Sequence, residues 1–162
     1  MSLISLMIFC LSISSSAFAG WHDWTQAQRN QAIVNEAYSW TNGIFGNECK
    51  VFAYNVVKNA SSGCVLLPGN NGNCSWKYSP NVTGRSQDIA YVLPGEIIQM
   101  QVTYNDGTIG PHTAIVVAKD LYGITFKESN WCLHDCQLVG TRYITFINFR
   151  KQAPCYTLNS VK

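Results

Sequence analysis

The chain has 162 residues, enough for one domain with a real core, and its eleven Lys and Arg against nine Asp and Glu give a net charge of +2. The charged residues are spread without runs of one sign, which excludes the basic patch of a nucleic-acid-binding protein, so we expect no nucleic-acid partner. No repeat, low-complexity tract or charged linker divides residues 20–162. We therefore expect them to form a single domain, and we expect that domain to be a monomer.

Residues 1–19 contain no charged side chain and are dominated by a short apolar run. They end in Ala17-Phe18-Ala19, the small-x-small pattern that a signal peptidase reads. Since so short a run would barely cross a bilayer, we predict a cleaved secretory signal and no stable membrane association after cleavage. The mature protein would then be secreted, to the extracellular space or the periplasm. An uncleaved N-terminal anchor is the alternative.

Two helices are expected next. The first has capping-box spacing at Thr25 and Gln28, carries an apolar face and ends before Asn42-Gly43. The second is predicted to start at residue 47 or 48 and to run to about residue 59, with apolar residues around it. Cys49 therefore falls in the first turn of this second helix.

The second half of the chain reads mainly as strands. Residues 61–84 are dense in Gly, Asn, Ser and Pro and are interpreted as a long loop. Four strands are predicted after it, at residues 97–104, 113–118, 124–128 and 142–149. Helices followed by a run of strands indicate an α+β fold, with the N-terminal helices packed on an antiparallel sheet.

Seven cysteines fall to six once the signal is removed, and disulfides persist in exported proteins. Two pairs lie close enough in the sequence to close local disulfides: Cys64 with Cys74, and Cys132 with Cys136. If Cys49 stays a free thiol, Cys155 is unpaired or displaces a member of those pairs, because connectivity cannot be deduced from sequence.

Cys49 is the candidate nucleophile. At the start of a helix, unpaired backbone N–H groups and the positive end of the helix dipole stabilise a thiolate and lower the thiol pKa from about 8.5 toward neutrality. A cysteine in an exported protein is nevertheless more often disulfide-bonded. The hypothesis therefore requires a base near Cys49.

His112 is the candidate base. It follows Gly110-Pro111 and opens the apolar strand 113–118, so its ring is held firmly at the mouth of a core strand, as a general base requires. His22 and His134 lie among polar or turn residues and fit a structural role better.

Glu128 and Asn130 are the candidates for the group that orients the histidine. They are two residues apart at the end of the predicted strand 124–128, so both side chains point to one face while the strand stays extended. Either could accept the second ring N–H of His112, which fixes its tautomer and stabilises the imidazolium. A plain strand-end turn is the alternative interpretation of this segment.

Four segments share a recognisable order and spacing: Gly46-x-x-Cys49 at a helix start, Pro94-Gly95-Glu96-Ile97-Ile98-Gln99, Pro111-His112-Thr113-Ala114-Ile115-Val116, and Glu128-Ser129-Asn130-Trp131. They resemble the CHAP family, the cysteine, histidine-dependent amidohydrolases/peptidases, which belongs with the papain-like and NlpC-type cell-wall hydrolases. The resemblance covers about residues 43–149. Lys50-Val51 stands where the NlpC-type relatives have Ser-Gly, which favours CHAP, and Glu96 stands where the family commonly has Asp.

The resemblance implies a papain-like fold and an enzyme with Cys49 as nucleophile, His112 as base, and Glu128 with Asn130 orienting the histidine and completing the site. It implies cleavage of amide bonds in peptidoglycan, as an N-acetylmuramoyl-L-alanine amidase or an endopeptidase, with no metal or organic cofactor. Two alternatives stay open. One is an inactive, disulfide-stabilised wall-binding module in which Cys49 is oxidised, and the other is a protease or amidase that acts on non-wall substrates.

Two further groups of residues have two interpretations each. Residues 132–136, Cys-Leu-His-Asp-Cys, could hold zinc, but the usual spacing signature and a second pair of ligands are missing, so we expect no metal. Trp76, Tyr78 and Trp131 could line a groove for a sugar-peptide strand, with Trp131 directly beside the site, or they could fill the core.

Overall fold

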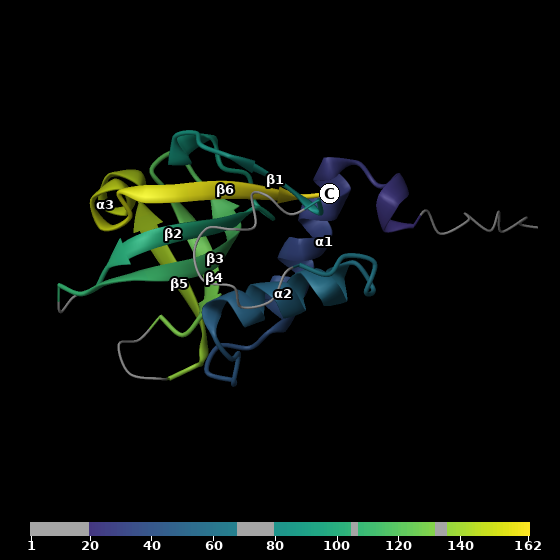
Figure 1. The fold of residues 1–162 in the computed structure, drawn as a ribbon, viewed down its shortest axis with the longest axis horizontal. Coiled ribbons are helices and arrows are strands. Elements are labelled where there is room, and N and C mark those ends of the chain that lie inside the picture. The colour runs from purple at the N-terminus through teal and green to yellow at the C-terminus, as the bar shows by residue number, and fades with distance from the viewer. Residues whose placement is uncertain (1–19, 68–79, 105–106, 132–135) are drawn as a thin grey trace, which may run out of the picture.

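The structure, a computed structural model, describes residues 20–67, 80–104, 107–131 and 136–162 (Figure 1). No helix in this described part is long and apolar enough to span a membrane. The predicted signal at residues 1–19 lies outside it. The elements in chain order are η1 (Trp21–Asp23), α1 (Gln26–Ser39), α2 (Cys49–Ala60), β1 (Val82–Arg85), η3 (Ile89–Tyr91), β2 (Ile97–Thr103), β3 (Ile109–Lys119), β4 (Gly123–Ser129), β5 (Val139–Thr145), α3 (Phe146–Gln152) and β6 (Cys155–Val161).

Both N-terminal helices form where the sequence predicts them. At the start of α1, the Thr25 hydroxyl accepts the Gln28 N–H and the Gln28 side chain accepts the Thr25 N–H, which closes the expected capping box. α2 begins at Cys49, with Glu48 as its N-cap residue. The predicted first turn of the second helix is therefore confirmed as the position of Cys49.

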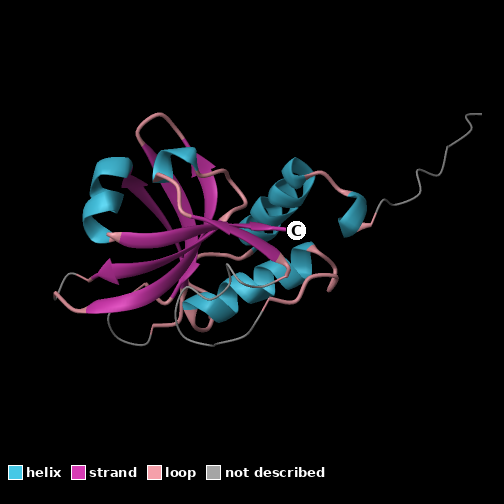
Figure 2. Cartoon of the chain, turned by 45° about the horizontal axis from the view of Figure 1, so that its top comes forward, coloured by secondary structure: helices cyan, strands magenta, loops and turns pink. Residues whose placement is uncertain are grey.

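The six strands form one antiparallel sheet in the order β1-β6-β2-β3-β4-β5. Strands β2 to β5 are neighbours in chain order, whereas β6 returns to lie between β1 and β2. Figure 2 shows how strongly this sheet twists beside α1 and α2. The α+β class and the antiparallel sheet are thus as predicted, and β3, which carries His112, lies between β2 and β4.

The sheet has a hydrophobic core on each face, because successive strand residues point to opposite sides. α1 and α2 cover one face and α3 the other (Figure 1). Each fully buried large apolar side chain contributes about 1.5–3 kcal/mol. The helix-side core includes Ile33, Phe52, Val56, Ile97 and Ile115. The opposite core includes Ile98, Met100, Val116, Phe126 and Phe149.

The C-terminal part of the chain departs from the prediction. β5 ends at Thr145, whose side chain accepts the Asn148 N–H at 3.3 Å and caps α3. The predicted strand at residues 146–149 is therefore wrong there. A short apolar run fits a strand and a buried helix equally well, so the period of this segment could not decide.

Two strands were not predicted. β1 begins inside the segment 61–84 that was interpreted as a loop and ends one residue beyond it, and β6 had no assignment. In β6 the side chains of Thr157, Leu158 and Asn159 are all buried, and Asn159 Nδ2 donates to the Ile97 carbonyl at 3.2 Å. Buried polar residues such as these hide the alternation of apolar and polar side chains that would mark a strand.

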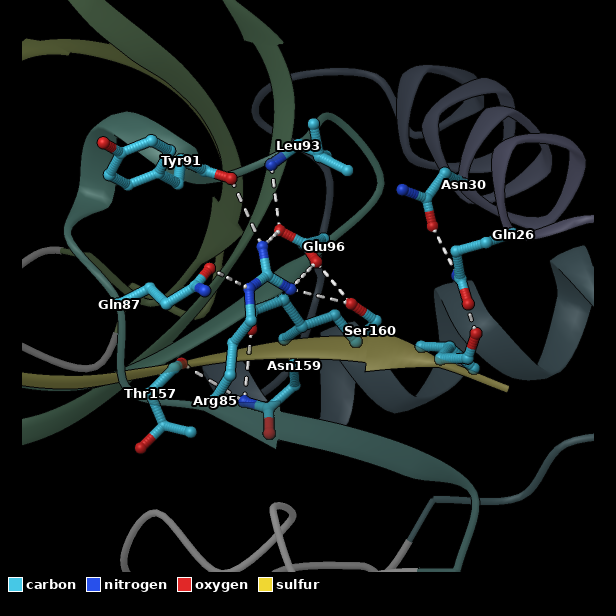
Figure 3. A network of polar contacts seen from close by, with 12 residues as sticks. Gln26, Asn30, Arg85, Gln87, Tyr91, Leu93, Glu96, Thr157, Asn159 and Ser160 are labelled. Atoms are coloured by element: carbon cyan, nitrogen blue, oxygen red, sulfur yellow. Dashed lines mark hydrogen bonds and ion pairs between the residues drawn. The ribbon is translucent and has the colours of Figure 1, made fainter.

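Glu96, directly before β2, joins three strands (Figure 3). Its side chain is fully buried and binds the Arg85 guanidinium of β1 through both carboxylate oxygens. It also accepts the Ser160 hydroxyl of β6 and, at 2.9 Å, the Leu93 N–H. A buried carboxylate is tolerated only when it is paired and hydrogen-bonded, so this network ties β1, β6 and β2 together.

Candidate active site

Cys49 carries a free thiol at the N-terminus of α2. The Glu48 side chain makes no cap hydrogen bond to this helix. In Figure 1 the beginning of α2 lies against the sheet, where the helix contacts β3 and β4. The sulfur is therefore placed where helix N–H groups and the helix dipole favour negative charge.

The loop before Cys49 is packed tightly against β4 and β5. A Cβ at Gly46 would lie 2.6 Å from both Ser129 Oγ and Val139 Cγ2, so a larger residue does not fit without displacement. Asn47 has a φ of 68°, a left-handed conformation that asparagine tolerates, and its carbonyl accepts the Ser129 hydroxyl at 2.6 Å. Gly46 of the Gly46-x-x-Cys49 pattern thus fixes the entry of the chain into α2.

His112 connects Cys49 to Glu128. Its side chain is buried on β3, and its Nε2 lies 2.9 Å from Glu128 Oε2. The Cys49 side chain hydrogen-bonds to the same ring, for which Nδ1 is the nitrogen left. α2, β3 and β4 together build a continuous thiol–imidazole–carboxylate chain, and Glu128 is the residue that contacts the ring.

The surroundings of Cys49 favour the thiolate. Burial raises the pKa of the thiol, but the hydrogen bond and charge of His112 lower it, as does the Thr113 N–H, and the resulting pKa lies below the ordinary value. The carboxylate of Glu48 opposes this by raising the pKa. The balance depends on a protonated His112.

The surroundings of His112 favour the imidazolium. Burial lowers its pKa, whereas the hydrogen bonds and charges of Cys49 and Glu128 raise it, to about 9. Burial raises the pKa of Glu128, but His112 and Arg142 outweigh burial, so this pKa lies below its ordinary value. The three shifts therefore favour negative charge on Cys49, positive charge on His112 and negative charge on Glu128.

Asn130 is close to the site but points elsewhere. Its backbone has a φ of 58°, which turns the chain out of the extended conformation that the prediction assumed. Its Nδ2 donates to Glu48 Oε2 at 2.7 Å, and Gln137 donates to the other oxygen at 3.1 Å. Asn130 therefore holds the residue before Cys49, while Glu128 holds the histidine.

Sequence reasoning missed Arg142 and Tyr104. Arg142 Nε donates to Glu128 Oε1 at 2.6 Å, and its guanidinium lies 3.6 Å from the centre of the Trp131 ring. Tyr104 packs on Trp131, and burial followed by nearby negative charges, including Cys49, raises its pKa. One signal for Arg142 was present in the sequence: it is a charged residue in the predicted strand 142–149, which follows the predicted strand of Glu128. Side chains at diagonal positions on paired strands can meet.

Trp131 lies directly beside the cluster, as expected, with its ring edge-on to His112 at a centroid distance of 4.9 Å. It also borders a groove of about 440 Å³, together with Thr103, Arg142, Asn148, Lys151 and Gln152. The other two aromatic residues expected to line a groove, Trp76 and Tyr78, lie outside the described residues.

The remaining cysteines partly contradict the expected pairs. Cys64 and Cys155 are free and exposed, so the possible bond between Cys64 and Cys74 is not formed and Cys155 is unpaired. Cys136 is disulfide-bonded, and Cys132 lies outside the described residues, so that pairing stays a prediction. Within the described ranges, no group of three or more His, Cys, Asp or Glu side chains could hold a metal ion.

The fold and the site define an α+β protein with a cysteine–histidine–glutamate cluster at the start of a helix. No family model matches the chain, and no curated protein matches it. Among solved structures it is similar to the crystal structure of Ly7917 with the hydrolyzing product of MDP, at a TM-score of 0.59 and 15% identity over 82% of this chain and 63% of that chain. A second crystal structure of Ly7917 gives a TM-score of 0.55 and 16% identity over 80% of this chain and 61% of that one. This chain thus spans less than two thirds of either neighbour, and identities this low show a shared fold alone.

Proposed function

We propose that this protein is a secreted cysteine hydrolase of the CHAP type, with a papain-like arrangement, that cleaves amide bonds in peptidoglycan. The observation that carries the proposal is the buried chain from Cys49 through His112 to Glu128, whose pKa shifts favour a thiolate beside an imidazolium. A thiolate is a strong nucleophile, and a neighbouring acid is what an amine leaving group needs.

The first half of the reaction forms an acyl-enzyme. The Cys49 thiolate attacks the amide carbonyl carbon and forms a C–S bond, while backbone N–H groups at the start of α2 stabilise the oxyanion. The imidazolium of His112 gives its proton to the amide nitrogen as the C–N bond breaks, and the amine leaves. The product of this half is a thioester on Cys49 and a neutral His112.

The second half restores the enzyme. Neutral His112 takes a proton from water, the resulting hydroxide attacks the thioester carbonyl, and the C–S bond breaks to release a carboxylic acid and the thiolate. Glu128 keeps its charge throughout and stabilises the imidazolium through the 2.9 Å contact with Nε2. These steps need no metal or organic cofactor.

Peptidoglycan is the proposed substrate for two reasons. The order of the Cys49, His112 and Glu128 segments resembles the CHAP family, and the structural neighbour Ly7917 was solved with the hydrolyzing product of MDP, a peptidoglycan fragment. The bond cut would be that of an N-acetylmuramoyl-L-alanine amidase or of an endopeptidase. We further propose that the protein acts as a monomer outside the cytoplasm after removal of residues 1–19.

The free thiol of Cys49 argues against the alternative of an inactive module in which this cysteine is oxidised. A protease or amidase with a non-wall substrate would use the same site chemistry. The two differ only in the substrate that is turned over.

The proposal is tested by digestion of purified peptidoglycan with the mature protein under mildly reducing conditions, followed by turbidity and mass spectrometry of released products. We expect new amine ends paired with either muramoyl or peptide carboxyl ends, and we expect Cys49→Ala to abolish them. Cys155→Ala, which removes a free exposed thiol elsewhere, is the matched control and should retain activity.

Full activity in Cys49→Ala would contradict the cysteine mechanism. If both proteins bound several wall types without releasing products, the wall-binding module would take the place of the enzyme. If only unrelated peptides were cleaved, the substrate assignment would fail while the mechanism stood.

A further inference from the structure

Arg142 reaches the cluster from β5 with a forked contact to Glu128. Its Nε donates to Oε1 at 2.6 Å and its Nη2 donates to Oε2 at 3.2 Å. The third nitrogen, Nη1, donates to Gln152 of α3 at 3.2 Å. All three guanidinium nitrogens are thus engaged by neighbouring side chains, and two of them fix the plane of one carboxylate.

The guanidinium is also held by an aromatic ring. Its central carbon lies 3.6 Å from the centre of the Trp131 ring, and the same ring meets His112 edge-on at 4.9 Å. Arg142 therefore touches Glu128 directly and is separated from His112 by one side chain. Its own side chain keeps 20% of its surface exposed, whereas that of Glu128 keeps 1%.

We propose that Arg142 is a positioning residue of the hydrolase, which keeps Glu128 ionised and aims its Oε2 at the His112 ring. The inference rests on the proposed function and extends it by one residue that neither the sequence pattern nor the mechanism above includes. In this role Arg142 acts on the reaction through its contact with Glu128.

The physical reason is that the two carboxylate oxygens of Glu128 have different hydrogen-bond partners. Among the described residues, Oε1 accepts from Arg142, while Oε2 contacts both Arg142 and His112. Without the guanidinium, the buried carboxylate would lose two hydrogen bonds and a positive charge, and it would be free to rotate or to take up a proton. Either change would release the imidazolium on which the Cys49 thiolate depends.

Among the described residues, the charged and titratable groups around His112 come from four parts of the fold. Cys49 and Glu48 stand at the start of α2, Glu128 on β4, Arg142 on β5, and Tyr104 just after β2. Arg142 supplies the positive charge that balances Glu128 on the side away from the histidine. A lysine at position 142 could replace the charge, but not the two-point contact with Glu128 or the stacking on Trp131.

A double-mutant cycle tests the inference. Arg142→Gln should lower kcat by about 10- to 100-fold with little change in KM, because a small misplacement of a catalytic group has effects of this size. In a Glu128→Gln background the same change should cost less than about twofold, because the two residues act as one unit. Arg142→Lys should recover only a small part of the loss.

Arg150→Gln is the matched control, because Arg150 makes a similar forked contact to Asp88 at the surface. It should leave kcat unchanged. Thermal unfolding of each variant shows whether the protein remains folded. An equal loss from Arg142→Gln in both backgrounds, or a loss confined to KM, would overturn the inference in favour of direct substrate binding.

The rate of Cys49 alkylation by iodoacetamide as a function of pH supplies a readout that needs no substrate. Without Arg142 the pKa of Glu128 rises, so Glu128 becomes protonated at a higher pH and no longer stabilises the imidazolium of His112. The fall of the Cys49 alkylation rate on acidification should therefore begin at a higher pH. An unchanged profile overturns the inference. A shifted profile in a protein that digests no peptidoglycan would preserve the inference while the proposed function failed.

Discussion

Glu96, directly before β2, and Glu128, on β4, look alike at first. Both side chains are buried, at 0% and 1% exposure, and each is held through both oxygens by an arginine from another strand. They differ in the remaining partners. Glu96 binds a serine hydroxyl and a backbone N–H, whereas Glu128 binds a histidine that in turn meets a cysteine.

This difference separates a structural ion pair from a candidate catalytic one. A carboxylate–arginine pair alone satisfies buried charge and joins strands, as Glu96 does in Figure 3. When a histidine ring also contacts the carboxylate, the same pair stabilises an imidazolium and, through it, a thiolate. Burial and pairing of a carboxylate therefore indicate function only together with the third group.

The largest expected effect comes from removing that ring. His112→Ala should lower kcat by at least about 10³-fold, because both proton transfers and the stabilised thiolate are lost. His22→Ala, which removes an exposed histidine far from Glu128 in the sequence, is the control and should leave kcat unchanged. Peptidoglycan digestion with both variants is the measurement, and comparable rates would remove His112 from the mechanism.

The equivalent change in the structural pair should act on stability. Glu96→Gln should lower the free energy of unfolding by about 3–5 kcal/mol, because Arg85 is left without its buried counter-charge. Denaturant unfolding measures this loss, and the fraction that remains folded should keep its kcat. A normal unfolding free energy would mean that the Glu96 network contributes nothing to the joining of β1, β6 and β2.

The two clusters should also differ in their response to alkaline pH. The pKa of His112 is raised to about 9, so kcat/KM should fall as pH rises through this value and the imidazolium is lost. The pKa of His112 is higher in the folded protein than in the unfolded chain, so its contribution to stability is fully present below about pH 6.5. This contribution is lost as the pH rises from there through the folded pKa of about 9. A kcat/KM that is flat to pH 10 would exclude His112 as the acid.

A smaller effect is expected at Asn130. Asn130→Ala should lower the free energy of unfolding by about 1–2 kcal/mol, because alanine is strained in the left-handed conformation. Asn130→Gly, which tolerates that conformation, separates the backbone effect from loss of the contact with Glu48. Both should reduce kcat much less than Glu128→Gln does, and the reverse order would make Asn130 the residue that orients His112.

The sequence predicted the parts of the site that have local signals. The helix start marks Cys49, the head of an apolar strand marks His112, and the strand end marks Glu128. It could not choose between Glu128 and Asn130, because the choice depends on the left-handed φ of Asn130, which breaks the extended alternation.

The parts that were missed depend on contacts between distant segments. Arg142 meets Glu128 because β5 pairs with β4, and β6 belongs to the sheet because it pairs with both β1 and β2. β5 ends where the Thr145 side chain caps α3, and this boundary lies inside an apolar segment that also fits a strand. The pairing of β4 with β5 and the place of β6 in the sheet join distant segments and cannot be read from a local pattern.

The most direct test of the proposed thiolate–imidazolium pair is the pH dependence of Cys49 alkylation, followed by mass spectrometry of the Cys49 peptide, in the wild type and in His112→Ala. Cys155 is an internal reference, since it is free and exposed. In the wild type we expect the alkylation rate of Cys49 to reach its plateau at a pH well below the ordinary thiol pKa of about 8.5. In His112→Ala we expect the rate to rise only as the pH approaches that value. Profiles that coincide, both rising near the ordinary thiol pKa, would show that His112 does not activate Cys49 and would contradict the proposed mechanism.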